Sequence, residues 1–438
     1  MKNNKPTLNL LTFVSKFQPQ DEAAIHALHT EMFEALEQKF FVRIIFLDKM
    51  ECFVTEPDRV GETVVFMATG GTENMAREAY ASLPHPTTLI TDGKANSLAA
   101  SMEFACWARQ QGDECQIKDF RMCFGDSYMK RETRNEKRET RNEKQETRNE
   151  TFKEGERIGV IGKPSDWLIS SSVDYAAARE RWGVEYVDIP LQKVDIYYNE
   201  CNEETRNEKQ ETRNEKQEVT SEASRLISAA YGCEEPDEQD VTKALRLYIS
   251  LKKIVEEYRL TALTIQCFSL IPTTCTTGCL ALALLNDEGI VAGCEGDLQS
   301  IFTMLLAKRA TGVDGFMANP SSADVESNRI VFAHCTIGLK QIERYILRSH
   351  FESGIGVAIQ GIIPDGEVTI VKCGGKGLDK SVVLTGRVID NLSDPNNCRT
   401  QILVELDDPI EYFFTRSIGN HHIILQGNHK AELERMLS

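Results

Sequence analysis

The chain has 438 residues, a formal net charge of −17 and a hydrophobic content of 41%. This length exceeds what one hydrophobic core usually holds, so two or three domains are expected. The acidic balance argues against nucleic acid and anionic membrane surfaces as main partners. The first residues carry no signal-peptide pattern, and no apolar run reaches the roughly 18 residues that cross a bilayer, so we expect no membrane span.

The 13 cysteines are odd in number and scattered, which is not the pattern of a disulfide framework. The closest pair, Cys275 and Cys279, lacks the CxxC spacing of structural zinc or thiol redox sites. We therefore expect buried thiols and a reducing, cytoplasmic location.

Strands and helices alternate over residues 1–130. The expected strands are 8–15, 42–48, 63–71 and 87–93, and the expected helices are 21–40, 74–83 and 97–109. This βαβ rhythm is typical of an open, mostly parallel sheet. Residues 1–130 are therefore predicted to form an N-terminal α/β domain.

Two charged segments, 131–151 and 203–218, repeat a seven-residue unit without an apolar position. A coiled coil needs an apolar seam, so none is expected here. Alternating charges fit a solvated helical arm, whereas the lack of any core fits disorder, and both interpretations stay open. We predict that both segments are insertions in surface loops, and a partner-binding role for them stays a hypothesis.

The alternation resumes after the first insertion. Residues 157–162, 184–191 and 260–268 are expected strands, and 173–183 and 241–258 are expected helices. They predict a second α/β domain over 152–345, interrupted by the second insertion. Short β-rich runs then fill the C-terminal domain, 346–438, at 356–364, 367–373, 382–390, 400–406 and 421–427. The predicted fold class is α/β, with two doubly wound α/β domains followed by a β-rich, barrel-like domain.

Glu295 is the first candidate for chemistry. Residues 289–294 form an expected buried strand, and a helical pattern begins at Leu298 with Asp297 at its N-cap position. Glu295 therefore lies at the carboxyl end of a strand, where open α/β sheets bind ligands. A functional carboxylate and a solvated loop residue both fit that position.

Four short segments follow one another along the chain: CEGD at 294–297, GFMANP at 315–320, AHCT at 333–336 and GNHHI at 419–423. Their order resembles that of the L-fucose and L-arabinose isomerase family. Arabinose isomerases carry GEGDW, FMED and SHM segments and a late histidine pair, and fucose isomerases share the glutamate, an aspartate and a late histidine. The resemblance is clearest over 262–340 and near the C-terminus, while the N-terminal half agrees mainly in its α/β rhythm.

This resemblance implies a divalent metal, typically manganese (Mn2+), and interconversion of aldoses and ketoses through a cis-enediol. It also implies a monosaccharide or substituted sugar as substrate and a closed homo-oligomer. Glu295 matches the family's glutamate, a metal ligand and acid/base group, and His334 matches the SHM histidine, a ligand. The late histidine maps to His421 or His422, of which one is expected to ligate because neighbouring strand residues face apart. We favour His422, because a β-branched residue follows it.

Asn319 departs from the family pattern. It lies 24 residues after Glu295 (319 − 295), which is the glutamate-to-aspartate spacing of fucose isomerases, so an amide stands at a carboxylate position. Its carbonyl can coordinate a metal weakly but cannot carry a proton. Asp314, Asp324 and Glu326 either compensate for the lost carboxylate or are solvated loop residues. The alternative function is a non-catalytic sugar-binding or regulatory protein on the same scaffold.

The weaker candidates for substrate binding are Thr72, Glu73, Trp167, Ser171 and His350. The first two belong to TGGTEN, which suits a sugar or anion loop as well as a tight turn with an N-cap. The tryptophan and serine fit sugar stacking and hydrogen bonding, or a packed polar loop. His350 and Glu352 open the β-rich part and fit the lining of a cleft.

Overall fold

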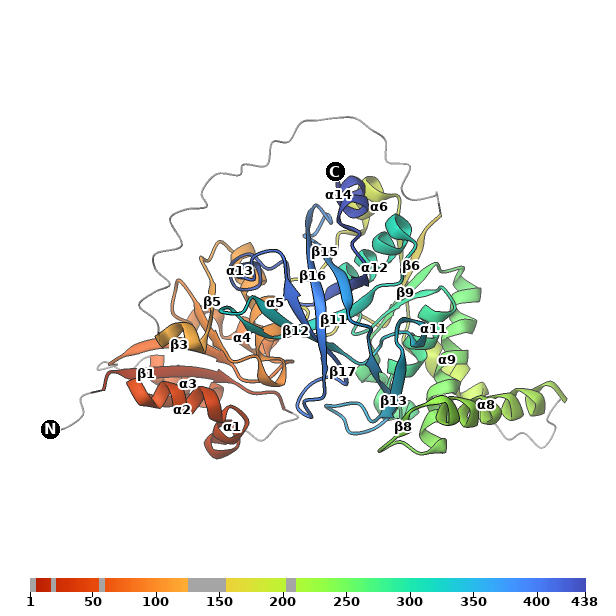
Figure 1. Cartoon of the computed structure of the whole chain (residues 1–438), viewed down its shortest axis with the longest axis horizontal. Helices are drawn as coiled ribbons and strands as arrows, with labels where there is room; N and C mark the ends of the chain where they lie inside the picture. The colour runs from red at the N-terminus through yellow and green to blue at the C-terminus, as the bar shows by residue number, and fades with distance from the viewer. Residues whose placement is uncertain (1–4, 17–20, 55–59, 125–154, 202–209) are drawn as a thin grey trace.

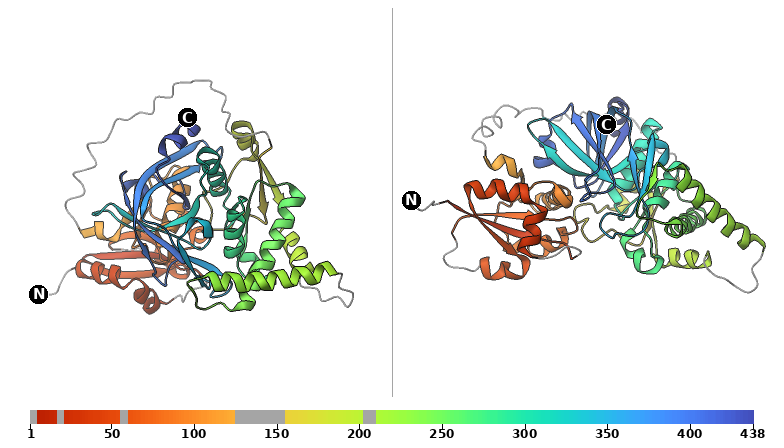
Figure 2. Two further views of the ribbon diagram at one scale, coloured as in Figure 1. Left: turned by 45° about the vertical axis from the view of Figure 1, so that its right-hand side comes forward. Right: turned by 60° about the horizontal axis from the view of Figure 1, so that its bottom comes forward.

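The computed structural model describes residues 5–16, 21–54, 60–124, 155–201 and 210–438. Two parallel α/β sheets are followed by a closed six-stranded antiparallel barrel, which confirms the predicted fold class. In Figure 1 the first sheet lies at the left in red and orange, the second at the right in yellow and green, and the barrel between them in teal and blue. Figure 2 shows the same three parts from two other directions.

The first sheet has the strand order β2-β1-β3-β4-β5, and every pair in it is parallel. Its strands are β1 (Thr7–Phe13), β2 (Phe41–Phe46), β3 (Glu62–Met67), β4 (Thr88–Thr91) and β5 (Gln116–Asp119), and its helices are α1 (Glu22–Leu28), α2 (Thr30–Lys39), α3 (Leu47–Val54), α4 (Glu73–Glu78) and α5 (Ser97–Gln110). The order reverses between β1 and β3. Doubly wound folds bind ligands at the carboxyl ends of the strands at such a reversal point.

The helix predicted over 21–40 is two helices, α1 and α2, because His29 interrupts it. The backbone of His29 has φ −115° and ψ 35°, outside the helical region. Its buried ring lies with Nδ1 2.9 Å from Asp92 Oδ2, beyond strand β4. This tertiary contact outweighs the local helical pattern.

The second sheet has the order β10-β9-β6-β7 and is also parallel. Its strands are β6 (Arg157–Ile161), β7 (Glu185–Ile189), β9 (Ala262–Ile265) and β10 (Val291–Gly293), and the helices of this part are α6 (Tyr175–Trp182), α7 (Gln192–Glu200), α8 (Gln210–Ala229), α9 (Glu238–Tyr258), α10 (Ile271–Thr274), α11 (Cys279–Asp287) and α12 (Leu298–Thr311). The order reverses between β6 and β9, so this sheet has a reversal point of its own.

Most of the repeat sequence lies outside the described residues. This holds for the whole of 131–151 and for 203–209, whereas 210–218 form the start of α8. The helical interpretation is therefore confirmed for 210–218, and α8 extends away from the rest of the molecule in Figure 1.

The barrel has the strand order β11-β12-β17-β16-β15-β18 and closes where β18 pairs with β11. Its strands are β11 (Phe316–Asp324), β12 (Arg329–His334), β15 (Gly366–Gly374), β16 (Lys380–Leu392), β17 (Thr400–Leu406) and β18 (His422–Gln426). β11 and β12 precede residue 346, yet they are barrel strands because they pair with β18 and β17. Conversely, the run 356–364 forms β14 (Ala358–Ile362), which pairs with β13 (Arg344–Arg348) outside the barrel.

The barrel strands are apolar on both faces because they separate two hydrophobic cores. Phe316 and Ile370 belong to one buried cluster, whereas their chain neighbours Met317 and Val371 belong to another. The second cluster contains buried residues of α12, which packs against β15. The helix α12 thus covers one outer side of the barrel and joins it to the second sheet.

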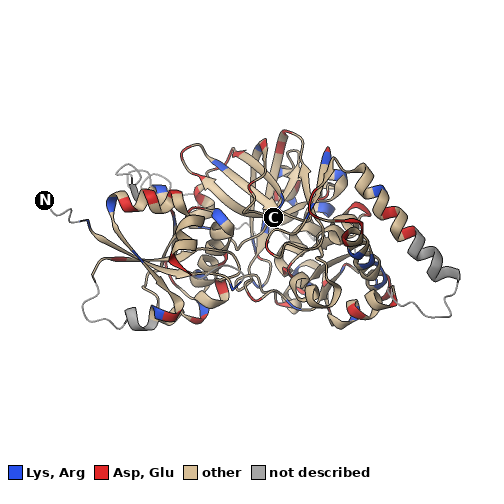
Figure 3. Ribbon diagram, turned by 90° about the horizontal axis from the view of Figure 1, so that it is seen from below, with Lys and Arg blue, Asp and Glu red and all other residues tan. Residues whose placement is uncertain are grey.

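Lys, Arg, Asp and Glu are mixed along the outer helices, as Figure 3 shows from below. Within the described part of the chain, no single helix has the length and apolar composition to cross a membrane. The helical segments Cys267–Thr274 and Cys279–Asp287 meet this length and composition only when they are counted together, and the chain bends sharply between them.

All three parts of the molecule meet at Glu103, a fully buried residue of α5. Its carboxylate accepts hydrogen bonds from Ser170 N at 2.7 Å and Ser171 Oγ at 3.1 Å, both in the second α/β part. It also accepts one from Asn420 N at 3.0 Å, just before β18 of the barrel. One side chain of the first part therefore satisfies backbone donors of the other two.

Glu103→Ala is expected to lower the free energy of unfolding by about 3 kcal/mol, because two buried N–H groups lose their acceptor at roughly 1–3 kcal/mol each. Urea denaturation followed by tryptophan fluorescence measures the change. Glu180→Ala, at an exposed position on α6, is the control and should have little effect. Equal stability of the two variants would contradict a joining role for Glu103.

Candidate active site

A cavity of about 240 Å³ opens where the reversal points of the two sheets face each other. From the first sheet it is lined by Ser15 and Lys16, which follow β1, and by Gly70, Gly71, Glu73, Asn74 and Met75, which follow β3. From the second sheet it is lined by Asp166, Trp167, Phe268 and Glu295, which follow β6, β9 and β10. A smaller adjoining cavity shares Asn96, Phe268, Glu295, Asn319 and Glu352 with it.

Glu295 lies directly after β10, as predicted, and an unusual backbone holds it there. Its φ is 61°, in the left-handed region that residues with a side chain rarely adopt, at a strain of about 1–3 kcal/mol. Gly296 has φ 69°, and a Cβ on it would come within 2.6 Å of Lys163 O. The carbonyl of Glu295 accepts a hydrogen bond from Ser165 N at 2.9 Å. The loop after β6 thereby fixes the direction of the Glu295 side chain.

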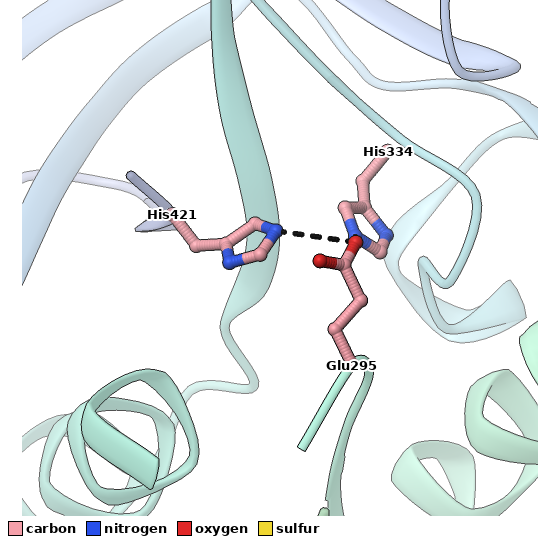
Figure 4. A group of neighbouring side chains, drawn as sticks. All are labelled: Glu295, His334 and His421. Atoms are coloured by element: carbon pink, nitrogen blue, oxygen red, sulfur yellow. Dashed lines mark ion pairs between the residues drawn. The ribbon is translucent and has the colours of Figure 1, made fainter. Parts of the chain in front are cut away.

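Glu295, His334 and His421 form the group shown in Figure 4. Glu295 Oε1 lies 3.5 Å from His421 Nε2 and 3.8 Å from His334 Nε2. One donor atom from each residue falls within 4.8 Å of the other two. Glu295 Oε2 accepts a hydrogen bond from Trp167 Nε1 at 2.6 Å, so Trp167 orients this carboxylate as well as lining the cavity.

Asp297 orients His421. Its Oδ2 lies 2.9 Å from His421 Nδ1, which donates to it, while its other oxygen caps α12 by accepting from Ser300 N at 2.8 Å. The predicted N-cap role of Asp297 is thus confirmed, with a second contact added. The buried ammonium of Lys372 lies 3.8 Å from Asp297 Oδ2 and compensates its charge. A carboxylate that binds one ring nitrogen of a histidine leaves the other aimed at a cation, as in many metal centres.

The residues of this group fit a divalent cation. His421 Nε2 is fully buried and, among the described residues, has no hydrogen-bond partner, although it lies 3.5 Å from Glu295 Oε1. Buried polar atoms are rarely left without a hydrogen bond, so this nitrogen beside a carboxylate suits a cation. One carboxylate and two imidazoles are a donor set that suits manganese and similar metals. A buried Glu/His/His group that could hold a metal is therefore present. The donor set does not determine which metal it would hold.

Glu295 and His421 carry opposite charges, and each shifts the pKa of the other toward its charged form. Burial alone would raise the pKa of Glu295, but the positive charge of His421 and the close polar contacts with His334 and His421 outweigh burial and lower that pKa well below the usual range. Burial lowers the pKa of His421, but Glu295 and Asp297 together raise it to about 9. Glu295 is consequently a permanent carboxylate at neutral pH. The position between it and Asp297 attracts positive charge, whether a proton on His421 or a metal ion.

His422, the histidine favoured by the sequence analysis, lies outside this group, and His421 takes its place. Nδ1 of His422 donates to Asn420 O at 2.7 Å, so its Nε2 accepts from Tyr412 Oη at 3.0 Å. Burial and the charge of Lys372 lower the pKa of His422 to about 3, which keeps its ring neutral. Both ring nitrogens are already bonded within the protein, and neither is free for a metal.

Asn319 is buried and lines both cavities beside Glu295. The nearby acidic residues do not replace the carboxylate that is missing there. Asp314 pairs with Lys308, and Asp324 accepts hydrogen bonds from Ser327 Oγ at 2.6 Å and from Glu326 N at 3.0 Å. None of the three lines either cavity.

Three of the five weaker candidates line a cavity: Glu73 and Trp167 the larger one and His350 the smaller one. Thr72 and Ser171 do not, and each has a structural contact instead. Thr72 Oγ1 donates to Thr69 O at 2.8 Å and closes the TGGTEN turn, which agrees with the tight-turn interpretation. Ser171 donates to Glu103, as described above. The binding role of these two residues stays a prediction, and neither lines the two cavities.

The sequence did not indicate Asn96 and Phe268, whereas Glu352, expected with His350 to line a cleft, lines both cavities. The backbone of Asn96 is left-handed, with φ 63°. Such conformations cluster at functional sites, but they are visible only in the structure and not in the sequence. Phe268 follows β9, so its position at the reversal point depends on knowing the strand order. The cavity draws on loops that are far apart in sequence.

No family model matches the chain. A sulfoquinovose isomerase of Clostridium sp. (strain MSTE9) is 27% identical over 185 residues, which are 40% of this chain and 41% of that protein. Sulfoquinovose isomerases of Priestia aryabhattai and Priestia megaterium (strain ATCC 12872 / QMB1551) are each 22% identical over 303 residues, 64% of this chain and 63% of theirs. The chain thus spans about two fifths to two thirds of these relatives. It is distantly similar to sugar isomerases, although these relatives are not named fucose or arabinose isomerases.

The adjacent histidines give a matched pair of variants. His421→Gln is expected to weaken Mn2+ binding by at least about 100-fold, since even residues that only orient a ligand contribute roughly 10–100-fold. His422→Gln should leave Mn2+ affinity close to that of the wild type, because its ring bonds only to Tyr412 and Asn420. Isothermal titration calorimetry measures both. Loss of binding in His422→Gln alone would contradict the arrangement.

Proposed function

We propose that the protein is a divalent-metal-dependent aldose–ketose isomerase of the fucose/arabinose isomerase type, acting on a monosaccharide or substituted sugar through a cis-enediol. The observation that carries this proposal is the buried group of Glu295, His334 and His421 at the end of a parallel strand. In it, His421 Nε2 lies 3.5 Å from Glu295 Oε1 and has no hydrogen-bond partner among the described residues. The distant similarity to sulfoquinovose isomerases supports the same reaction class. A closed homo-oligomer in the cytoplasm belongs to the proposal.

Glu295, His334 and His421 would hold the metal, with Mn2+ as the proposed ion. When bound, the metal supplies Lewis acidity toward the oxygens of the sugar. Asp297 holds His421 in the tautomer that leaves Nε2 open, and Trp167 fixes one oxygen of Glu295. These contacts order the donor atoms before the sugar arrives, so little reorganisation is needed during the reaction.

The remaining lining suits a sugar. Trp167 and Phe268 meet edge to face, with ring centroids 5.3 Å apart, and give one wall an apolar surface. Asn96, Asn319 and Glu73 add hydrogen-bonding groups around it. Sugars present apolar C–H faces and rims of hydroxyl groups, so a few polar groups on an apolar wall orient them.

Removing bound metal with EDTA is expected to abolish aldose turnover, and Mn2+ should restore it. L-fucose and sulfoquinovose serve as probes, with ketose formation followed by nuclear magnetic resonance. Glu295→Gln should reduce kcat by at least about 100-fold, since it removes a metal-binding carboxylate and an acid/base group. Glu180→Gln is the control. Turnover that survives EDTA would overturn the metal requirement.

A non-catalytic sugar-binding protein is the second candidate, and Asn319 is the observation that favours it. An amide at this buried position provides no charge for a metal and no proton for catalysis.

Asn319→Asp separates the two candidates. For an enzyme, the wild type already binds Mn2+ and turns over a sugar, and the added carboxylate tightens Mn2+ binding on the order of tenfold. Calorimetry and the turnover assay measure both quantities. If the wild type neither binds Mn2+ nor turns over a sugar while Asn319→Asp gains both, the non-catalytic function is the correct one.

A further inference from the structure

The proposed reaction needs a group that carries a proton between two carbon atoms. In the ring-opened aldose a base removes the proton of C2, the C2–H electron pair forms the C1=C2 bond, and O1 takes up a proton. The O2 proton then leaves, the C2=O2 bond forms, and C1 receives a proton, so no atom is gained or lost. Glu295 already faces two histidines and Trp167, and Asn319 cannot carry a proton.

Four carboxyl groups line the larger cavity: Glu73, Asp166, Glu295 and Glu352. Asp166 is 71% exposed and pairs with Lys163 at 3.2 Å, so it stays solvated. Burial raises the pKa of Glu73 well above its usual range, and its Oε2 has no hydrogen-bond partner among the described residues. Glu73 lines only the larger cavity, whereas His334 of the candidate metal centre lines the smaller one.

We propose that Glu352 is the catalytic carboxyl group that carries the proton between C2 and C1, taking over the acid/base role that Asn319 cannot perform. This inference rests on the proposed isomerase function. Glu352 lines both cavities, together with Glu295 and Asn319. It therefore faces the same space as the candidate metal centre without belonging to the group that would hold the metal.

The loop that carries Glu352 is held in place by its own hydrogen bonds. Gly354 N donates to His350 O at 2.8 Å, and His350 N donates to Ile355 O at 3.0 Å. His350 Nδ1 accepts from Ser353 N at 3.3 Å, which closes the turn around Glu352. Gly356 has φ 69°, and a Cβ on it would come within 2.5 Å of Thr277 Oγ1. The loop therefore packs closely against the second α/β part.

Asn96 meets Glu352 from the first α/β part. Its Nδ2 donates to Glu352 Oε1 at 3.5 Å, a long hydrogen bond that leaves the other carboxylate oxygen for a ligand. Asn96 is buried and lines both cavities. Its left-handed backbone with φ 63° is a strained conformation that places this amide beside the cavity.

The surroundings of Glu352 suit proton transfer at neutral pH. Burial, together with the negative charge of Glu295, raises its pKa to about 7, while the hydrogen bond from Asn96 opposes the rise. A group with a pKa near the working pH both accepts and returns a proton efficiently.

The test compares the Mn2+-loaded wild type with Glu352→Gln, using L-fucose and sulfoquinovose as probes. The amide keeps the shape of the side chain but cannot carry a proton, so kcat is expected to fall by at least about 100-fold. Mn2+ affinity should stay close to that of the wild type. The exchange of the C2 hydrogen with D2O should be lost, and so should the limb of the kcat–pH profile that reports the Glu352 carboxyl group. Glu343→Gln, at an exposed position outside the cavities, is the control.

The outcomes separate this inference from the proposed function. If the wild type isomerises a probe and Glu352→Gln keeps its kcat and its C2 exchange, the role of Glu352 is overturned while the isomerase function stands. If the Mn2+-loaded wild type isomerises neither probe, both are overturned. Glu352→Asp keeps the carboxyl group and should retain measurable C2 exchange. Equal loss in Glu352→Asp and Glu352→Gln, with unfolding of both, would assign Glu352 a structural role and overturn the inference.

Discussion

The candidate site depends on one buried carboxylate, Glu103, which joins three parts of the molecule. Its hydrogen bonds reach the loop after β6 and the residue before His421. Each sheet alone has a reversal point at the carboxyl ends of its strands, and a ligand bound there would contact protein on one side only. Because Glu103 fixes the two edges and the barrel relative to one another, the edges become opposite walls of one cavity. The same contact at Asn420 sets where His421 enters that cavity.

A line of alternating buried charges then defines the chemistry of the site. Lys372 compensates Asp297, Asp297 orients His421, and His421 faces Glu295. A buried charge without a partner is very unfavourable, so each group in this line is kept by its neighbours. The line ends at Glu295, which lines the cavity and lies 3.5 Å from His421 Nε2, a nitrogen without a hydrogen bond among the described residues. Positive charge at this end completes the alternation, which is why a divalent cation fits it.

Local patterns in the sequence were enough to predict the two parallel sheets, the β-rich end, the position of Glu295 and the cap at Asp297. Choices that depend on long-range pairing were not predictable. β18 begins at His422, so His421 precedes the strand and the alternation of strand side chains does not apply to it. Likewise β11 and β12 join the barrel only through their pairing with β18 and β17. Glu352 was expected, with His350, to line a cleft, but the sequence could not show that its loop reaches the cavity of Glu295 and Asn319 from outside both sheets.

The amide at position 319, where the resemblance predicts a carboxylate, is compatible with the proposed catalysis. The reaction requires a proton-carrying group that faces the sugar, whichever element supplies it. Glu352 meets that requirement from a loop beyond β13, whereas Asn319 keeps a polar group on β11. Placing Glu352 near the permanent charge of Glu295 is unfavourable for stability, since like charges repel and burial adds to the cost. A protein that only bound a sugar would gain nothing from this arrangement, and strongly perturbed carboxyl groups in a cavity are typical of active sites.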